Sequence, residues 1–337
     1  MVHIWAAAPR ADIAGAPTES LDGALHRSYL TSFPDLFPCQ RPESRGLGLL
    51  GGCVTRSAFG IASICFWSSF ASGCAHLAPL SPLAPLERSI VYCPAPFPVG
   101  LWQPVDLAHE NVYFESQDGG RLHGWYVPHD DPQAVALFLH GNAGNVTHRA
   151  PTLRALHDRH DLTVLTFDYR GFGRSEGKPH ERGILQDARA ARAWLAERTG
   201  VAERDIVLIG RSLGGGVAVD LAANDGARGL VLTSTFTSLP DVGSHHLPWL
   251  PTRLLMTNRL DSLAKIERYE GPLLQSHGDA DELVPYELGR RLFDAAPGSK
   301  RFVTIAGGRH NDPWNEEFHK QLGHFLASCG ASHETFR

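Results

Sequence analysis

A serine at a sharp, glycine-flanked turn is the residue of this chain best suited to nucleophilic chemistry. Residues 210–215 read GRSLGG, with an apolar run at 206–209 before them and a small-residue stretch at 216–223 after them. This order predicts a strand, a tight turn and a helix, with Ser212 at the tip. Such a turn strains the serine backbone, and side chains at the flanking positions would collide with adjacent elements. Since 34 glycines occur in 337 residues, the pattern needs support from partner residues.

Suitable partners for this serine follow later in the chain. A serine hydroxyl becomes a useful nucleophile when a histidine takes its proton and a carboxylate orients that histidine. Residues 277–285 read HGDADELVP, residues 307–312 read GGRHND, and each segment follows an apolar run. The candidate carboxylates are therefore Asp279 and Asp281, and the candidate base is His310.

The elements that must position these residues alternate between apolar runs and helical patterns. Two early runs flank a turn at 117–120, which is a hairpin signal, and the later runs are apolar on both faces, as in a covered parallel sheet. This alternation predicts a doubly wound α/β sheet. The expected strands are 111–115, 122–127, 134–139, 163–167, 206–209, 230–233, 273–276 and 302–305. The expected helices are 151–159, 181–198, 286–295 and 313–327.

Together with HGNAGN at 140–145 and FDYRGFGRS at 167–175, these motifs resemble those of the α/β-hydrolase fold family. The resemblance covers about residues 105–328. It implies an α/β fold with a mostly parallel eight-stranded sheet, helices on both faces, and a short cap at about 235–270 after the sixth strand.

The resemblance also implies roles for the residues of the triad. In that family the chain order is serine, then aspartate or glutamate, then histidine. It therefore assigns Ser212 as the nucleophile, Asp281 as the acid and His310 as the base. Asp279, two residues closer to its strand, is the second choice for the acid.

The loop at 140–145 is assigned by the same resemblance to the oxyanion hole. The backbone N–H groups of Asn142 and Leu213 would bind the negatively charged oxygen of the tetrahedral intermediate. Asp168 and Ser175, in the turn at 167–175, are expected to be structural because short polar side chains favour such turns.

The full set of motifs is similar to the branch that contains the membrane-associated α/β-hydrolase domain proteins, some of which are depalmitoylases, and serine aminopeptidase-like proteins. We expect a serine hydrolase that cleaves small acyl esters or thioesters through a covalent acyl-enzyme without a cofactor. The alternatives are an aminopeptidase-like amide hydrolase and a catalytically silent binding module. Apolar residues of the cap either line an acyl pocket or pack on the sheet. The cap has no clear carboxylate cluster for a substrate amine, which favours esters.

Composition excludes several other classes of function. Hydrophobic residues make up 43% and charged residues 20%, as in an ordinary globular protein. The net charge is -5 and no basic block is present, so nucleic-acid binding is not expected. Five of the six cysteines precede residue 94, and none has zinc-type spacing, so neither a metal site nor a disulfide framework is predicted. The oligomeric state is not indicated.

The first ninety residues carry a different pattern. No charged residue occurs from 57 to 86, and the apolar core at 58–71 is short for a membrane span but typical of a signal-peptide core. The segment ends at Ala71-Ser72-Gly73-Cys74, which resembles a bacterial lipobox. The expected location is therefore membrane-associated or exported, with a tether through Cys74, and cytoplasmic if this segment is not a signal.

Three regions follow from this pattern. Residues 1–53 are expected to be an unstructured or misassigned extension, with translation starting at Val54 as one hypothesis. Residues 54–90 would form a signal, lipoprotein-like or anchor segment and a Pro-rich tether. Residues 91–330 would form the catalytic domain. An uncleaved anchor and a soluble extension are the alternatives for the apolar segment.

The lipoprotein hypothesis predicts a mature chain that begins at Cys74 with a lipid on its N-terminus. Mass mapping of the protein isolated from its native host tests it. Recovery of an intact peptide spanning Gly73 and Cys74 from the mature protein would rule the hypothesis out.

Overall fold

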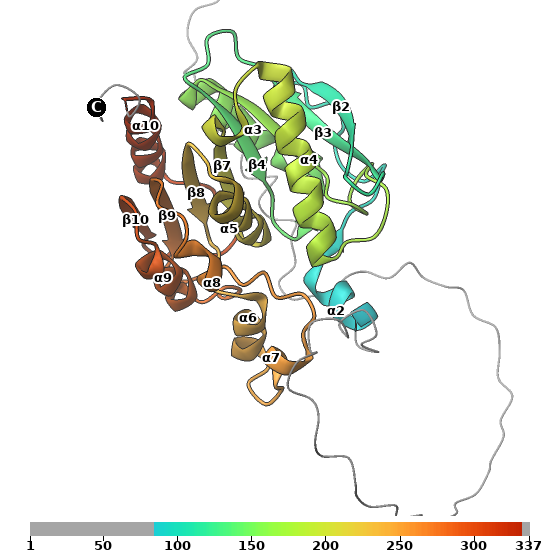
Figure 1. The fold of residues 1–337 in the computed structure, drawn as a ribbon, viewed down its shortest axis with the longest axis vertical. Helices are drawn as coiled ribbons and strands as arrows, with labels where there is room; N and C mark the ends of the chain where they lie inside the picture. The colour runs from blue at the N-terminus through green and yellow to red at the C-terminus, as the bar shows by residue number, and fades with distance from the viewer. Residues whose placement is uncertain (1–83, 332–337) are drawn as a thin grey trace, which may run out of the picture. The chain divides into compact units, whose positions relative to one another are not determined.

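The structure, a computed structural model, describes residues 84–331. Eight strands form one sheet in the order β10-β9-β8-β7-β4-β6-β3-β2 (Figure 1). Only the pairs β2–β3 and β3–β6 are antiparallel. The strands are β2 (Glu110–Glu115), β3 (Arg121–Val127), β4 (Ala134–Leu139), β6 (Leu162–Phe167), β7 (Val207–Arg211), β8 (Gly229–Thr233), β9 (Leu273–Gly278) and β10 (Lys300–Ile305). The predicted eight-stranded, mostly parallel sheet is confirmed.

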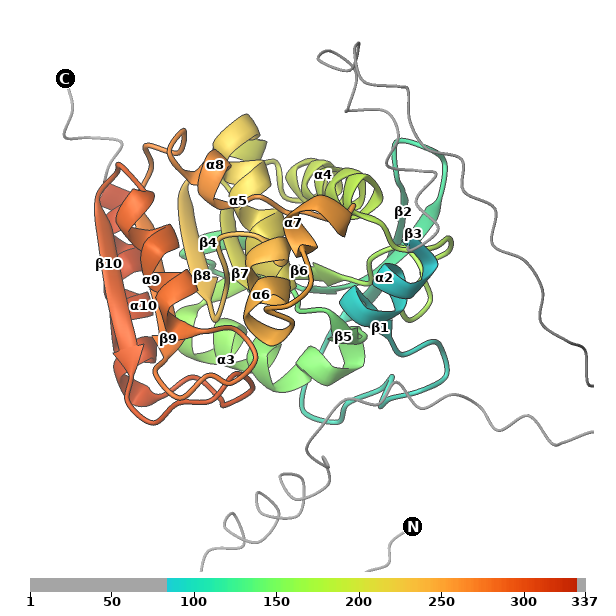
Figure 2. The same cartoon turned by 90° about the horizontal axis from the view of Figure 1, so that it is seen from below.

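Helices cover both faces of this sheet, because the buried strands carry apolar side chains on both sides (Figures 1 and 2). In β4, Leu137 and Leu139 belong to the apolar cluster that includes residues of α4, α5 and α9, while Ala136 and Phe138 belong to the one that includes residues of α3 and α10. The helices are α2 (Ala84–Val91), α3 (Ala150–His160), α4 (Glu181–Thr199), α5 (Leu213–Asp225), α6 (Leu239–His246), α7 (Thr252–Leu255), α8 (Leu263–Ile266), α9 (Tyr286–Ala295) and α10 (Glu316–Ala331).

Short elements complete the fold. Helices α6, α7 and α8 fill the connection between β8 and β9, where the sequence predicts the cap. A two-stranded pair, β1 (Cys93–Pro94) with β5 (Ala143–Gly144), is not predicted.

The last helix begins at Glu316 rather than at residue 313, because the Asn315 side chain caps it by accepting a hydrogen bond from the Phe318 N–H at 2.8 Å. The 3-10 turns are η2 (Val146–Arg149) and η3 (Glu203–Asp205).

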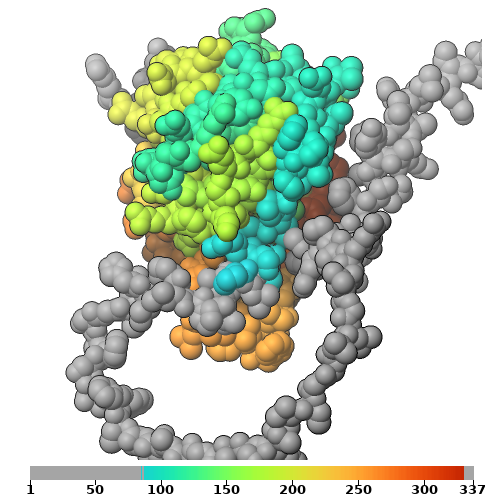
Figure 3. Space-filling model, turned by 90° about the vertical axis from the view of Figure 1, so that its right-hand side faces the viewer, coloured from blue at the N-terminus to red at the C-terminus, as the bar shows by residue number. Residues whose placement is uncertain are grey.

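Helix α2 corrects one expectation. The sequence places residues 84–90 in an extended tether, but they form a helix whose first turn accommodates Pro85. The buried Glu87 carboxylate accepts hydrogen bonds from the backbone N–H groups of Thr257 at 2.9 Å and Asn258 at 2.6 Å. Tyr92 donates its hydroxyl to the Asn258 side chain at 2.9 Å. The helix is thus bonded to the end of the cap, and Figure 3 shows both at the same end of the molecule.

The remaining expectations for the N-terminus, including the extension at 1–53, the apolar segment and Cys74, lie outside the described residues. Within residues 84–331, none of the helices has the length and apolar character needed to span a bilayer.

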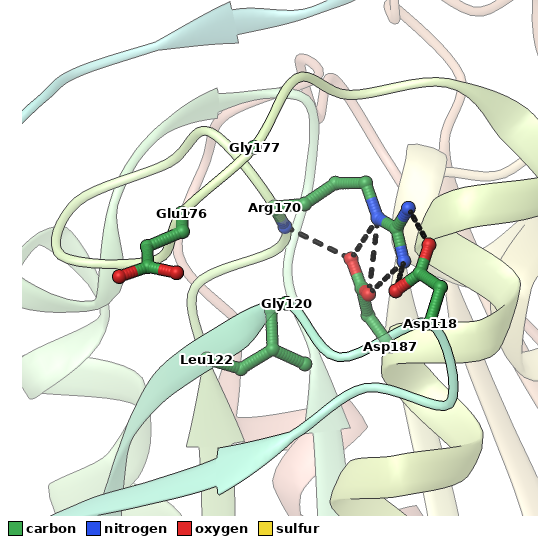
Figure 4. A pocket seen from close by; sticks show the side chains of 7 residues that line it. All are labelled: Asp118, Gly120, Leu122, Arg170, Glu176, Gly177 and Asp187. Carbon is green, nitrogen blue, oxygen red and sulfur yellow. Dashed lines mark hydrogen bonds and ion pairs between the residues drawn. The ribbon is translucent and has the colours of Figure 1, made fainter.

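A buried arginine joins three elements near the hairpin edge of the sheet (Figure 4). Arg170, in the loop after β6, donates to the Asp187 carboxylate on α4 at 2.7 Å and to Asp118 in the β2–β3 turn at 2.7 Å. The Asp187 side chain is fully buried, whereas that of Asp118 is 45% exposed. The small pocket beside this cluster is thus lined by a structural ion pair.

Replacement of Asp187 by Ala is expected to destabilise the protein by about 3–5 kcal/mol, because it leaves the buried guanidinium without its main partner. Asp118→Ala is the matched control and is expected to cost about 1 kcal/mol or less, since its carboxylate is half exposed. Urea unfolding measures both changes. Equal effects of the two substitutions would contradict this account of the pair.

Candidate active site

The turn between β7 and α5 holds Ser212 in a strained backbone conformation. Its φ is 52° and its ψ is -119°, a region that residues other than glycine rarely adopt. The turn is fixed by hydrogen bonds from the Ser212 N–H to the Thr233 carbonyl at 2.9 Å and from the Thr235 hydroxyl to the Ser212 carbonyl at 3.0 Å. The strain is therefore held in place by the neighbouring strand β8 and the residues that follow it.

The glycines around the turn are needed because other atoms occupy the space of a side chain. A Cβ on Gly214 would lie 2.0 Å from the Leu139 carbonyl oxygen at the end of β4. One on Gly215 would lie 2.4 Å from the Thr235 hydroxyl oxygen. The first turn of α5 thus passes directly over the ends of the strands, as the sequence pattern predicts.

Three side chains from separate loops meet at this turn. His310 follows β10, and its Nε2 lies 3.1 Å from the Ser212 Oγ. The His310 Nδ1 lies 2.8 Å from the Asp281 Oδ2, in the loop after β9. A carboxylate at Nδ1 keeps the hydrogen there and leaves the Nε2 lone pair to accept the serine proton. All three residues are at least nine-tenths buried.

The second candidate for the acid lies elsewhere. Asp279 is exposed, and its Oδ1 accepts a hydrogen bond from the Gly307 N–H at 2.6 Å, which joins the two loops. Its carboxylate has no bond to His310 among the described contacts, so Asp281 is the carboxylate that the structure brings to the histidine.

The Asp281 carboxylate is held by four donors. Its Oδ1 accepts hydrogen bonds from the N–H groups of Leu283 at 2.9 Å and Val284 at 2.8 Å, and its Oδ2 is contacted by His277 and His310. Burial works to raise the pKa of the Asp281 carboxyl, but the hydrogen bonds from the two histidines outweigh it and hold the pKa well below its usual range.

The loop after β4, which carries Asn142, passes beside the serine. A Cβ on the neighbouring Gly141 would lie only 3.5 Å from the Ser212 Cβ. The Asn142 side chain donates to the Val91 carbonyl at 3.1 Å, and its own carbonyl accepts from the Cys93 N–H at 2.9 Å. Leu213 is the first residue of α5, so its N–H has no partner within the helix. Leu213 therefore directly follows the nucleophile, and Asn142 directly follows Gly141, the residue of this loop that lies beside it.

Asp168 and Ser175 have the structural role that the sequence predicts. The Ser175 hydroxyl donates to the Asp168 carbonyl at 2.6 Å, and the Asp168 carboxylate accepts from the Val146 N–H at 2.9 Å. Asp168 also contacts the buried His123 at 3.1 Å. These contacts join the loop after β6 to the segment after the Asn142 loop.

Sequence reasoning assigns no role to Arg211, the residue before the nucleophile. Its guanidinium donates to the carbonyl oxygens of His310 at 2.7 Å and Asp312 at 3.3 Å, so it fixes the loop that carries the histidine. Burial lowers its pKa, and the charge of Asp281 opposes that shift. Its position directly before Ser212 is the only sequence signal for this role.

The cap contacts the site through its first helix. The His246 ring lies 2.8 Å from the carbonyl oxygen of Leu283, two residues after Asp281. Phe236 is buried in the core, whereas Trp249 is 77% and Leu254 is 85% exposed. Some apolar residues of the cap thus pack on the sheet and others face outward.

Within the part of the chain that the structure describes, no group of three or more His, Cys, Asp or Glu side chains is arranged to hold a metal ion.

Comparisons with known proteins indicate the family and the fold of the chain. A family model described as serine aminopeptidase, S33, matches residues 130–260. An uncharacterized protein of Mycobacterium tuberculosis is 43% identical over 229 residues, which cover 67% of this chain and 81% of that protein. The α/β-hydrolase domain-containing protein WAV2 of Arabidopsis thaliana is 32% identical over 260 residues, which cover 69% of this chain and 83% of that protein. A solved esterase of Pyrococcus furiosus has a similar fold, with a TM-score of 0.60 at 22% identity. The match covers 71% of this chain and 98% of the esterase chain.

The depressed pKa of Asp281 makes a prediction about stability. Its ionised form stabilises the fold above the ordinary carboxyl pKa of about 3.9, and this contribution is lost as the pH falls below that value. Asp281→Asn is therefore expected to lower the free energy of unfolding more at pH 7 than at pH 3, as measured in urea. Asp279→Asn, at the exposed carboxylate, is the control. If Asp281→Asn lowered the free energy of unfolding equally at both pH values, the result would contradict a depressed pKa of Asp281.

Proposed function

The chain belongs to the α/β-hydrolase family, and on that premise we propose that it is a serine hydrolase that cleaves carboxylic esters or thioesters of small acyl substrates. One observation carries the proposal: a continuous series of hydrogen bonds runs from Asp281 through His310 to the hydroxyl of Ser212. The serine at its end stands at the tip of a strained turn between a strand and a helix.

In the proposed reaction the Ser212 oxygen attacks the carbonyl carbon of the substrate, and its proton passes to the His310 Nε2. The histidine then gives that proton to the leaving alcohol or thiol, and an acyl-enzyme ester remains on the serine. A water molecule attacks this ester in the same way, with His310 taking its proton; the bond from the acyl carbon to the Ser212 oxygen then breaks, and His310 returns the proton to that oxygen as the acid leaves. Asp281 retains its contact with the Nδ1–H throughout and stabilises the imidazolium.

The negative charge on the substrate oxygen would be bound by the N–H groups of Asn142 and Leu213. Donors fixed in place before the reaction need no reorganisation when the charge develops, and the loss of one typically costs about 10²–10³ in kcat. The bonds of Asn142 to Val91 and Cys93 support this role, because they fix the loop that carries one donor.

Amide hydrolysis is the second candidate, since the matching family model is that of a serine aminopeptidase. An aminopeptidase must bind the free amine of its substrate, for which a carboxylate is the natural partner. In the cap, Asp241 is paired with Arg253 at 2.6 Å, and Asp261 accepts a backbone N–H. Glu267 and Glu270 are exposed. These carboxylates are paired or directed to solvent, which favours the ester.

A fluorophosphonate probe is expected to label Ser212 in the wild-type protein, because the base makes its oxygen nucleophilic. Ser212→Ala should abolish labelling, whereas the exposed Ser299→Ala should not change it. Mass spectrometry of the labelled peptide identifies the residue. A wild-type protein that is not labelled would favour a silent binding module.

A panel of acyl esters of increasing chain length and of aminoacyl amides distinguishes the two enzymatic candidates. We expect kcat/KM to be higher for esters, with all turnover lost in Ser212→Ala. Turnover of amides alone would replace the ester proposal with the aminopeptidase.

A further inference from the structure

A second histidine contacts the carboxylate of the candidate triad. His277, at the end of β9, is fully buried, and its Nε2 lies 3.2 Å from the Asp281 Oδ2. The same Nε2 lies 2.9 Å from the carbonyl oxygen of Val284. The Asp281 Oδ2 therefore stands between two imidazole rings, that of His277 and that of His310 at 2.8 Å.

The contacts of His277 determine which ring nitrogen carries the hydrogen. A carbonyl oxygen can only accept a hydrogen bond, so the Nε2 that faces Val284 must be the donor. The opposite nitrogen, Nδ1, is buried and has no hydrogen-bond partner within the described residues. A Cβ on Gly289 would lie 2.1 Å from this Nδ1, so the ring is packed closely against α9. The Nε2–H thus points to Val284 and Asp281 in a fixed orientation.

Building on the proposed function, we propose that His277 is a positioning residue that acts on catalysis through Asp281. Its Nε2–H holds the carboxylate beside His310 and shares the oxygen that the His310 Nδ1–H also contacts. Sharing reduces the negative charge available to His310, so the carboxylate orients that ring without binding its protonated form too strongly.

The charged and titratable groups that face these rings are few. His310 is bonded to Asp281, and its carbonyl oxygen is bonded to Arg211. His277 faces Asp281 and the ring of Tyr286, whose centroid lies 5.9 Å away. Among the described residues, Asp281 is the one carboxylate bonded to either ring, so a change at His277 reaches His310 through it.

His277→Leu removes the Nε2–H donor, so the Asp281 Oδ2 is then contacted by His310 alone. The imidazolium form of His310 is then favoured, because the carboxylate is a stronger acceptor. The midpoint of the acid limb of kcat/KM is expected to move up by about 0.5–1 pH unit, so kcat/KM at a pH below the midpoint is expected to fall by about three- to tenfold.

Three further variants separate positioning from simple loss of stability. His277→Gln places an amide N–H near the position of Nε2 and should restore the wild-type midpoint. His277→Asn is shorter and does not reach the carboxylate, so it replaces the Leu variant if that variant does not fold. His160→Leu is the control: His160 is a buried histidine on α3 whose ring contacts His319 at 3.1 Å, so its loss lowers stability without moving the midpoint.

The titration of the His310 ring by NMR gives a readout that needs no turnover. The signal is assigned by its absence in His310→Ala, and the midpoint is compared among the folded variants. We expect an upward shift in His277→Leu or His277→Asn and none in His277→Gln or His160→Leu. An unchanged midpoint in a folded variant that lacks the donor would overturn the role of His277. A shifted midpoint in a protein that hydrolyses no ester would support this role and overturn the proposed function.

Discussion

The strained backbone at Ser212 is the constraint on which the rest of the site depends. A φ of 52° in a residue with a side chain is tolerated only where the surroundings hold it. Here the bonds to Thr233 and Thr235 hold it from the side of β8, and the absence of a side chain on Gly214 lets α5 start directly over β4. The hydroxyl is thereby presented at the edge of the sheet rather than buried within it.

Parallel pairing of the strands explains why the partners of this serine converge. The carboxyl ends of β7, β9 and β10 lie at one edge, so loops far apart in the sequence deliver Ser212, Asp281 and His310 to a single point. The cost of burying the Asp281 charge is offset by four donors, two on each oxygen. Electrostatics and topology therefore support the same assignment of roles.

Much of this arrangement is predictable from local sequence. Apolar runs on both faces indicate the central strands, and motifs at their ends locate the three side chains that the structure brings together. Helix α2 was not predictable, because prolines in a charge-free segment favour an extended tether, whereas Glu87 is held by Asn258 in the cap. The contacts of Arg211 and His277 are likewise long-range or depend on ring orientation, which no local pattern encodes.

The central claim is that the chain forms a covalent acyl-enzyme on Ser212. Rapid acid quenching of the protein during turnover of an ester, followed by peptide mass spectrometry, tests this most directly. The account predicts that the mass of the acyl group is found on the peptide containing Ser212. Steady ester turnover with an acyl group on another residue, or turnover that persists in Ser212→Ala, would contradict it.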